Sequence, residues 1–223
     1  MRVFALLADN GPDVSRLCHS CLTQLPGVSG AGLAVCSTLA GRGVRYVSDE
    51  TSANVEELQF VLGEGPGVDA FSNGRPALAA DLADREYALR WPAFAPGAVL
   101  TGARALFAFP LRIGTIRVGV LDLYRDRPGP LGDEEVADAL VFADAVTMLL
   151  LTEDHSETAD WQEQAGYDPR AVVHQATGMV TVQTGGSIDE AFARVRAFAY
   201  AEGRHLTDVA DDVVNHRLRF DDL

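Results

Sequence analysis

Residues 172–183, VVHQATGMVTVQ, decide the character of the C-terminal third of the chain. Their four valines and two threonines favour a β-strand, whereas the alanine and glycine suit a helix that another molecule approaches closely. The preceding Asp168 and Pro169 favour the helix, because aspartate is a good N-cap and proline fits the first helical position. We predict a helix that ends at the TGG of residues 184–186. Its buried face would carry Val173, Ala176 and Val180.

Two more helices are predicted after this one. Ser187 and Glu190 have the spacing of a capping box, which begins a helix that would end near Gly203. Its predicted buried residues are Ile188, Ala191, Phe192, Val195 and Ala199. A third helix is expected from about Thr207, and it would bury Val209, Ala210 and Val213. Residues 168–223 are therefore predicted to form a three-helix bundle.

The part before this bundle has the pattern of an α+β fold with an antiparallel sheet and flanking helices. An apolar stripe predicts a helix over residues 14–25, and a serine start and two glutamates predict another over 52–62. The GEGPG that follows is expected to be a rigid loop, and ALRWPAFAP at residues 88–96 to end in a surface crossing. The expected strands are 30–36, 44–47, 76–82, 103–113 and 115–126, the last two joined as a hairpin at Gly114 and Thr115.

Acidic residues 133–135 predict the start of a long helix, because the helix dipole favours negative charge there. Its apolar positions step by four and three residues, as in a heptad. This seam consists of Val136, Leu140, Ala143, Thr147 and Leu150. The helix could pack on its own sheet, pair with a second copy, or do both along different turns. We place one domain at 1–152, an acidic or helical linker at 153–167 and the second domain at 168–223.

Composition excludes several kinds of chemistry. The chain has 223 residues with a formal net charge of −14, and all 18 basic residues are arginine. A P-loop and Schiff-base catalysis both need lysine, so neither is expected. The acidic balance argues against broad adhesion to nucleic acid or anionic membrane, although a local basic face remains compatible with it. No apolar run is long enough to span a bilayer, so we expect a cytoplasmic protein.

Cys18 and Cys21 form a C-x-x-C motif, which can indicate redox or metal chemistry. Both lie on the apolar stripe of the helix predicted at 14–25, and a zinc site would need two further ligands. We therefore expect both thiols in the core, with no metal and no cofactor. No nucleophile, base and orienting residue recur in a recognisable spacing, so we do not expect an enzyme.

Residues 12–152 resemble a GAF domain. The resemblance rests on LGEGPG at 62–67, on ALFAFPLRIGTIRVGVLDLY at 105–124 and on the order of elements. It implies a sensor that binds a small molecule or pairs with itself. The lysine-containing motif of cyclic-nucleotide-binding members is absent, and no histidine or cysteine lies between Ser37 and Asp154 to hold haem or bilin. Candidate pocket residues are Phe60, Phe71, Tyr87, Trp91, Phe94 and Phe107, although aromatic residues at this spacing are more often core.

Residues 168–217 resemble the ANTAR domain, an RNA-binding module of transcription antiterminators. The resemblance is carried by Ala176, Gly178, Ala191, Ala199, Val209 and Ala210. It implies a signal-responsive regulator, expected to be a homodimer, that binds paired RNA hairpins. One departure is Thr177, where many members have a basic residue. The candidate RNA-binding residues are Arg170, His174, Ala176, Thr177, Gly178, Arg194, Arg196 and Arg204.

Two other functions stay open for this part. From residue 168 onward six arginines stand against nine acidic residues, which favours a protein-interaction module that has lost RNA binding. Residues 206–220 also look superficially like a helix-turn-helix DNA reader, but Asp208, Asp211 and Asp212 would repel phosphates. Tyr200 could stack on a base, although we expect it at the edge of the core.

Overall fold

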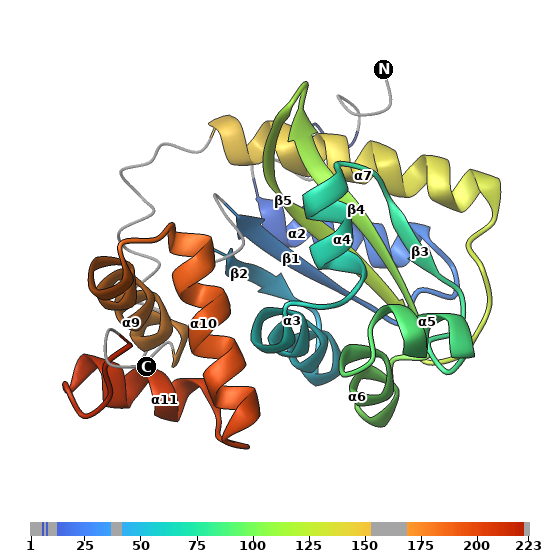
Figure 1. The fold of residues 1–223 in the computed structure, drawn as a ribbon. Helices are drawn as coiled ribbons and strands as arrows, with labels where there is room; N and C mark the ends of the chain where they lie inside the picture. Colours follow the sequence, from blue (N-terminus) through green and yellow to red (C-terminus); the bar gives the residue numbers. More distant parts are fainter. Residues whose placement is uncertain (1–5, 7, 9–12, 37–41, 153–168, 221–223) are drawn as a thin grey trace. The chain divides into compact units, whose positions relative to one another are not determined.

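The computed structural model describes residues 6, 8, 13–36, 42–152 and 169–220. The chain divides into two compact units, Met1–Ser37 with Arg42–Glu153 and Thr38–Gly41 with Asp154–Leu223. The linker predicted at 153–167 lies outside the described residues. The predicted α+β class is confirmed, with an antiparallel sheet in the first unit and helices in the second (Figure 1).

The described part of the first unit is built on a five-stranded antiparallel sheet with the order β2-β1-β5-β4-β3. Its strands are β1 (Gly30–Cys36), β2 (Arg42–Val47), β3 (Ala77–Ala79), β4 (Ala105–Ile113) and β5 (Ile116–Arg125). The predicted hairpin is confirmed, because β4 and β5 pair from Ala105↔Arg125 to Ile113↔Ile116 around Gly114. Gly114 has a φ of +59°, a conformation that suits glycine in a tight turn.

One face of the sheet is covered by α2 (Val14–Gln24) and α7 (Asp133–Thr152) (Figure 1). The Asp13 carboxylate caps α2 by accepting from the backbone N–H groups of Ser15 and Arg16. Cys18 and Cys21 are buried in the core between α2, α7 and the sheet, as predicted. The C-x-x-C motif therefore follows from the inward stripe of α2.

The other face is covered by short helices where we predicted loops. They follow α3 (Glu50–Leu62) and are α4 (Pro66–Asn73), α5 (Arg85–Arg90) and α6 (Phe94–Leu100). The prediction for GEGPG was wrong in part: Gly63, with a φ of +62°, ends α3, and Pro66 begins α4 at once. The predicted surface crossing was also wrong. Trp91 and Phe94, only 2% and 0% exposed, draw α5 and α6 onto the core.

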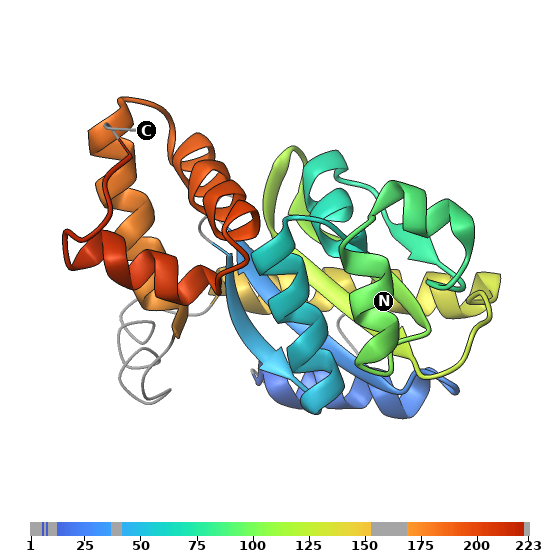
Figure 2. The same cartoon turned by 60° about the horizontal axis from the view of Figure 1, so that its bottom comes forward.

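The described part of the second unit contains α9 (Pro169–Thr184), α10 (Ile188–Ala201) and α11 (Leu206–Val214). Residues 172–183 are thus helical, because burial of Val173, Ala176 and Val180 overrides the strand preference of the valines. The capping box of Ser187 and Glu190 is confirmed. In both views α11 runs across the other two helices (Figure 2).

Two details of this unit differ from the sequence prediction. Ile188 is 51% exposed because it is the first residue of α10, where the helix has not yet reached its neighbours. The third helix begins at Leu206, whose side chain is 3% exposed and joins the core. No helix within the described ranges is long and apolar enough to cross a membrane.

Candidate nucleic-acid interface

The outward face of α9 has small residues at two of its four exposed positions. Ala171, Gln175, Gly178 and Val182 recur at steps of four and three residues, and all four are exposed. A Cβ added at Gly178 would meet no described atom within 4 Å. Glycine inside a helix costs about 1 kcal/mol relative to alanine, and no packing within the unit requires it here. The glycine therefore leaves room for a molecule that approaches from outside.

Two of the predicted contact residues do not lie on this face. Ala176 and Thr177 are 0% and 2% exposed, and the Thr177 hydroxyl donates to the carbonyl oxygen of Val173 at 2.7 Å. The hydrogen bond satisfies the threonine inside the core, which a longer basic side chain could not enter without displacing its neighbours. Ala176 and Thr177 therefore lie in the core of the unit and not on the outward face of α9, and the Thr177 hydroxyl is bonded within its own helix.

The outward face of α10 combines small residues with charge. Ala193, Ala197 and Ala201 are exposed beside Arg194, whose charge, after the hydrogen bonds of Ser187, helps to lower the pKa of the Glu190 carboxyl. Arg196 is half-buried, with its guanidinium 4.7 Å from the centre of the Phe192 ring. Of the arginines predicted to contact RNA, Arg194 is therefore the most available for a phosphate.

Tyr200, one turn after Arg196 on α10, is 78% exposed. The prediction that it lies at the edge of the core was wrong, because the inward positions of this turn are taken by Ala199 and Phe198. The structure thus adds an open aromatic ring to this face. The sequence signal for it was the spacing of Tyr200 from the exposed Ala193 and Ala197, seven and three residues earlier.

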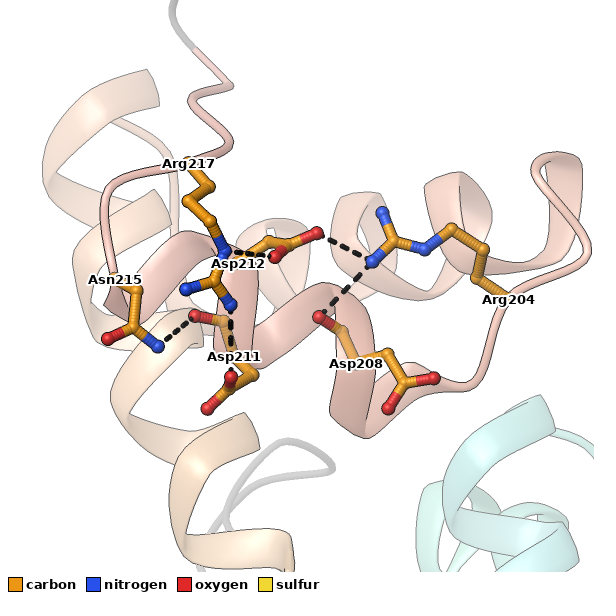
Figure 3. Close-up of polar contacts among 6 residues, drawn as sticks. All are labelled: Arg204, Asp208, Asp211, Asp212, Asn215 and Arg217. Carbon is orange, nitrogen blue, oxygen red and sulfur yellow. Dashed lines mark hydrogen bonds and ion pairs between the residues drawn. The ribbon is translucent and has the colours of Figure 1, made fainter.

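Arg204 is not freely available, because it belongs to a charge network across α11 (Figure 3). Its Nη2 lies 2.6 Å from Oδ2 of Asp212, and Nε of Arg217 lies 2.6 Å from Oδ1 of the same carboxylate. Arg217 also contacts Asp211 at 3.0 Å. Asp212 thereby joins the turn before α11 to the segment after it.

The network perturbs the groups that form it. Hydrogen bonds from Arg204 and then Arg217 lower the pKa of the Asp212 carboxyl, and the hydrogen bonds that Arg217 donates to Asp212 and then Asp211 raise the pKa of its guanidinium. A phosphate that engages Arg204 would have to replace Asp212 as its partner. We therefore assign Arg204 a structural role in the unit and not a contact with RNA.

The remaining predicted contacts are less defined. His174 is half-buried on α9. The side chain of Arg170 lies outside the described residues, although its backbone belongs to α9. Neither observation tests a role in binding.

The aromatic residues predicted to line a pocket in the first unit do not share one cavity. Phe107 packs with α2 and α7, whereas Trp91 and Phe94 pack on the opposite face with Leu106 and Tyr124. Successive residues of a strand point to opposite faces, so Leu106 and Phe107 must separate in this way. Tyr87 is half-buried and stacks on Trp91 at 5.5 Å, while Phe60 and Phe71 are 3% and 7% exposed.

A surface hollow of about 380 Å³ does occur in this unit, but none of the six aromatic residues lines it. Its lining is mostly polar and includes an ion pair of Arg90 with Asp69 at 2.6 Å. Five of the six are therefore buried core residues, which was the alternative interpretation of their spacing, and Tyr87 packs against this core at its edge.

A buried polar network that the sequence did not reveal lies under the sheet. The Gln59 amide donates to Oδ2 of Asp122 at 2.7 Å, and its oxygen accepts from the backbone N–H of Gly67 at 2.5 Å. Gln59 and Asp122 are 0% and 2% exposed. A Cβ at Gly67 would lie 2.7 Å from Asp122 Oδ2, so the last glycine of LGEGPG is required by contact. This motif therefore locks α4 onto β5.

The cysteines show no sign of activation. Burial, followed by the charge of Asp13, raises the pKa of the Cys18 thiol to about 12, and burial raises that of Cys21 further. Reactive cysteines have the opposite shift, because the thiolate is the nucleophile. Within the described ranges no cluster of three or more histidine, cysteine or acidic side chains could hold a metal ion.

The two units resemble different known proteins. Residues 164–214 match the family model of the ANTAR domain. No curated protein matches the chain. The GAF domain region of a proposed membrane protein from Geobacter sulfurreducens PCA has a TM-score of 0.51 and 14% identity, over 68% of this chain and 97% of that one. This likeness shows a GAF fold in the first unit.

Two further structures resemble the same unit at lower scores. A domain of a proposed two-component sensor histidine kinase protein from Sinorhizobium meliloti 1021 has a TM-score of 0.47 and 19% identity, over 68% of this chain and 92% of that one. The type II free methionine-R-sulfoxide reductase from Thermoplasma acidophilum has a TM-score of 0.47 and 17% identity, over 65% and 94%.

Proposed function

Because the chain carries an ANTAR domain at residues 164–214 after a unit with a GAF fold, we propose that it is a signal-responsive regulator that binds RNA hairpins. The first unit receives the signal, and the helical unit binds the RNA. By analogy with the ANTAR family, binding favours an antiterminator hairpin and lets transcription proceed. The proposal assigns no catalytic step to the chain.

The observation that carries this proposal is the open surface of the ANTAR unit. Gly178 leaves room above α9, and the α10 face offers the exposed Arg194 among alanines. RNA loops present unpaired bases and a phosphate backbone. A surface with few large side chains lets both approach closely. On α11, Asp211 and Asp212 are meanwhile paired with Arg204 and Arg217.

The small number of available cations sets an expectation for salt dependence. Each phosphate contact contributes about one unit to the slope of log affinity against log salt. With Arg204 and Arg217 held by Asp212, we expect a shallow slope and a large share of binding from base contacts. A steep slope would indicate that RNA opens the Asp212 network.

The test is binding of the full chain to an RNA of two adjacent hairpins, titrated against salt, with Arg194→Glu beside the wild type. We expect Kd to rise about 10- to 100-fold, because a charge-assisted hydrogen bond is lost and a repulsion is added. The salt slope should fall by about one. Arg204→Glu is a poorer probe, because it also breaks the network on α11.

Arg85→Glu is the matched control, since Arg85 is exposed in the first unit and its reversal changes net charge equally. Equal losses in both variants would mean that only overall charge matters. If the wild type binds no hairpin RNA, the proposed function fails, and the alternative of a protein-interaction module takes its place.

The proposal includes a homodimer, for which the structure changes the expected surface. Two members of the predicted seam, Ala143 and Thr147, are 2% and 3% exposed and face their own sheet. These two members of the seam therefore belong to the internal packing of α7, whereas its member Leu140 is 41% exposed. Leu140 also belongs to an outward stripe on α7, whose exposed members are Ala137, Leu140, Asp144, Met148 and Leu151.

A second copy is the proposed partner of this outward stripe. Its members recur at steps of three and four residues, the spacing that lets two helices pack side by side. Pairing two RNA-binding units raises the effective concentration of the second unit at a neighbouring hairpin. This links dimerisation to affinity for paired hairpins.

Sedimentation of the Leu140→Glu/Met148→Glu variant tests the dimer. We expect a monomer that binds a single hairpin normally and loses the gain from the second hairpin. Leu100→Glu is the control, because Leu100 on α6 is 89% exposed. A wild type that sediments as a monomer at all concentrations would contradict the proposed dimer.

A further inference from the structure

Aromatic and guanidinium groups alternate along one side of α10. Phe192, Arg196 and Tyr200 follow one another at intervals of four residues, and such positions are neighbours on a helix. Phe192 is 2% exposed, Arg196 is half-buried and Tyr200 is 78% exposed. The series therefore leads from the core of the unit to its surface.

The contact between Arg196 and Phe192 shows in which direction these side chains extend along α10. The Arg196 guanidinium lies 4.7 Å from the centre of the Phe192 ring, so this side chain extends back toward the start of the helix. Long helical side chains share this direction, which places the Tyr200 ring over the turn that holds Arg196 and Ala197. The ring keeps its exposure because the residues beside it on this face are alanines.

The surroundings of Tyr200 fit a nucleobase better than a protein partner. Its exposed neighbours Ala193, Ala197 and Ala201 add little apolar area. The other large exposed apolar side chain of α10 is Ile188, twelve residues earlier, which is about 18 Å along a helix. A protein interface needs a broader apolar centre than one ring. A stacked base needs only a free ring face and room for its sugar, which the alanines leave.

We propose that Tyr200 stacks on an unpaired base of the hairpin loop, with Arg196 beside it as a second planar surface. This inference rests on the RNA binding proposed above and names the side chain that holds the base. Arg194, on the neighbouring side of α10, lies where the phosphate backbone of the same loop can pass. Stacking tolerates any base, so Tyr200 contributes affinity for a loop and little discrimination among bases.

The test compares two RNAs that have the same pair of stems, one with adenosine loops and one with abasic loops. Tyr200→Ala should raise Kd for the adenosine-loop RNA about 5- to 100-fold and leave Kd for the abasic-loop RNA unchanged. Tyr200→Phe keeps the ring and should bind as the wild type does. Alanine favours helix and the site is exposed, so the fold should be preserved, as circular dichroism can confirm.

A second readout does not depend on affinity. Tyr200→Trp places an indole at the site, and its fluorescence should be quenched by the adenosine-loop RNA beyond any change in the parent chain. The abasic-loop RNA should cause no such quenching.

The outcomes separate this inference from the proposed function. If the wild type binds hairpin RNA but Tyr200→Ala binds both RNAs as the wild type does, or loses both equally, Tyr200 does not stack on a loop base. If the wild type binds neither RNA, the proposed function fails as well. Leu100→Ala, an equally exposed apolar residue in the first unit, should change neither Kd.

Discussion

Gly67 and Gly178 both lie in helices, yet the space around them is opposite. A Cβ at Gly67 would lie within 2.7 Å of Asp122 Oδ2 and of Gln59 Oε1, whereas a Cβ at Gly178 would meet no described atom within 4 Å. The first glycine is required by a neighbour inside its own unit. The second has no such neighbour, so its reason must come from outside the unit.

This contrast extends to the two units. Under the sheet of the GAF-fold unit, aromatic side chains and a buried amide–carboxylate network occupy the positions where we had expected a pocket. In the ANTAR unit the outward faces of α9 and α10 carry alanine, glycine, arginine and one open ring. A glycine in a helix therefore indicates a binding surface only where the structure shows that no neighbouring side chain fills the space beside it.

The largest expected effect is that of Gly67→Ala on the stability of the first unit. The added methyl group must displace buried Gln59 or Asp122, and overpacking of this kind costs about 1–3 kcal/mol. Denaturant unfolding followed by fluorescence should show the loss, since Trp91 is buried in this unit.

Gly97→Ala is the matched control for that experiment. Gly97 lies within α6, and a Cβ there would meet Leu58 at 3.4 Å, an ordinary contact. This variant should unfold as the wild type does or at slightly higher denaturant. Equal stability of Gly67→Ala and Gly97→Ala would contradict the close packing of LGEGPG.

Gly178→Ala should act in the opposite direction on stability. Alanine in the open middle of α9 should raise the free energy of unfolding of the ANTAR unit by about 0.5–1 kcal/mol. The same methyl group should weaken binding of the two-hairpin RNA, because it fills the space left for the loop. Thermal unfolding by circular dichroism and an RNA titration measure the two effects.

A stabilised Gly178→Ala variant with unchanged RNA affinity would remove the α9 face from the interface. The binding site would then reduce to the α10 face around Arg194 and Tyr200.

The smallest expected effect concerns Asp212 and pH. Hydrogen bonds from Arg204 and Arg217 lower its folded pKa below the ordinary carboxyl value of about 4. Its contribution to stability is therefore full above that value and is lost as pH falls through the lower folded pKa. The difference in Tm between the wild type and Asp212→Asn should be small at neutral pH and should shrink below about pH 4. A difference that does not change with pH would show that the ion pairs contribute nothing.

Local signals in the sequence predicted most of the framework. The pair Asp168-Pro169 predicted the start of α9, and Ser187 with Glu190 predicted the start of α10, because capping depends on residues three or four positions apart. The β4–β5 hairpin followed from two apolar strands around Gly114. The helices at 66–73 and 85–100 escaped prediction, since short segments rich in proline and glycine become helical only when Trp91 and Phe94 pack against the sheet.

By itself, the sequence determined the order of the strands and of the helices other than α4, α5 and α6, the helical state of residues 172–183 and the absence of lysine chemistry. Tertiary structure alone decided whether a residue at the edge of a helix's apolar stripe is buried or exposed. Thr177 became buried, whereas Ile188 and Tyr200 became exposed. The reason is physical: periodicity defines a stripe, but the neighbouring helices determine how far around the helix burial extends. Gly178 and Arg194 of the candidate interface were predicted from the sequence, whereas the exposure of Tyr200 and the burial of Ala176 and Thr177 emerged only from the folded unit.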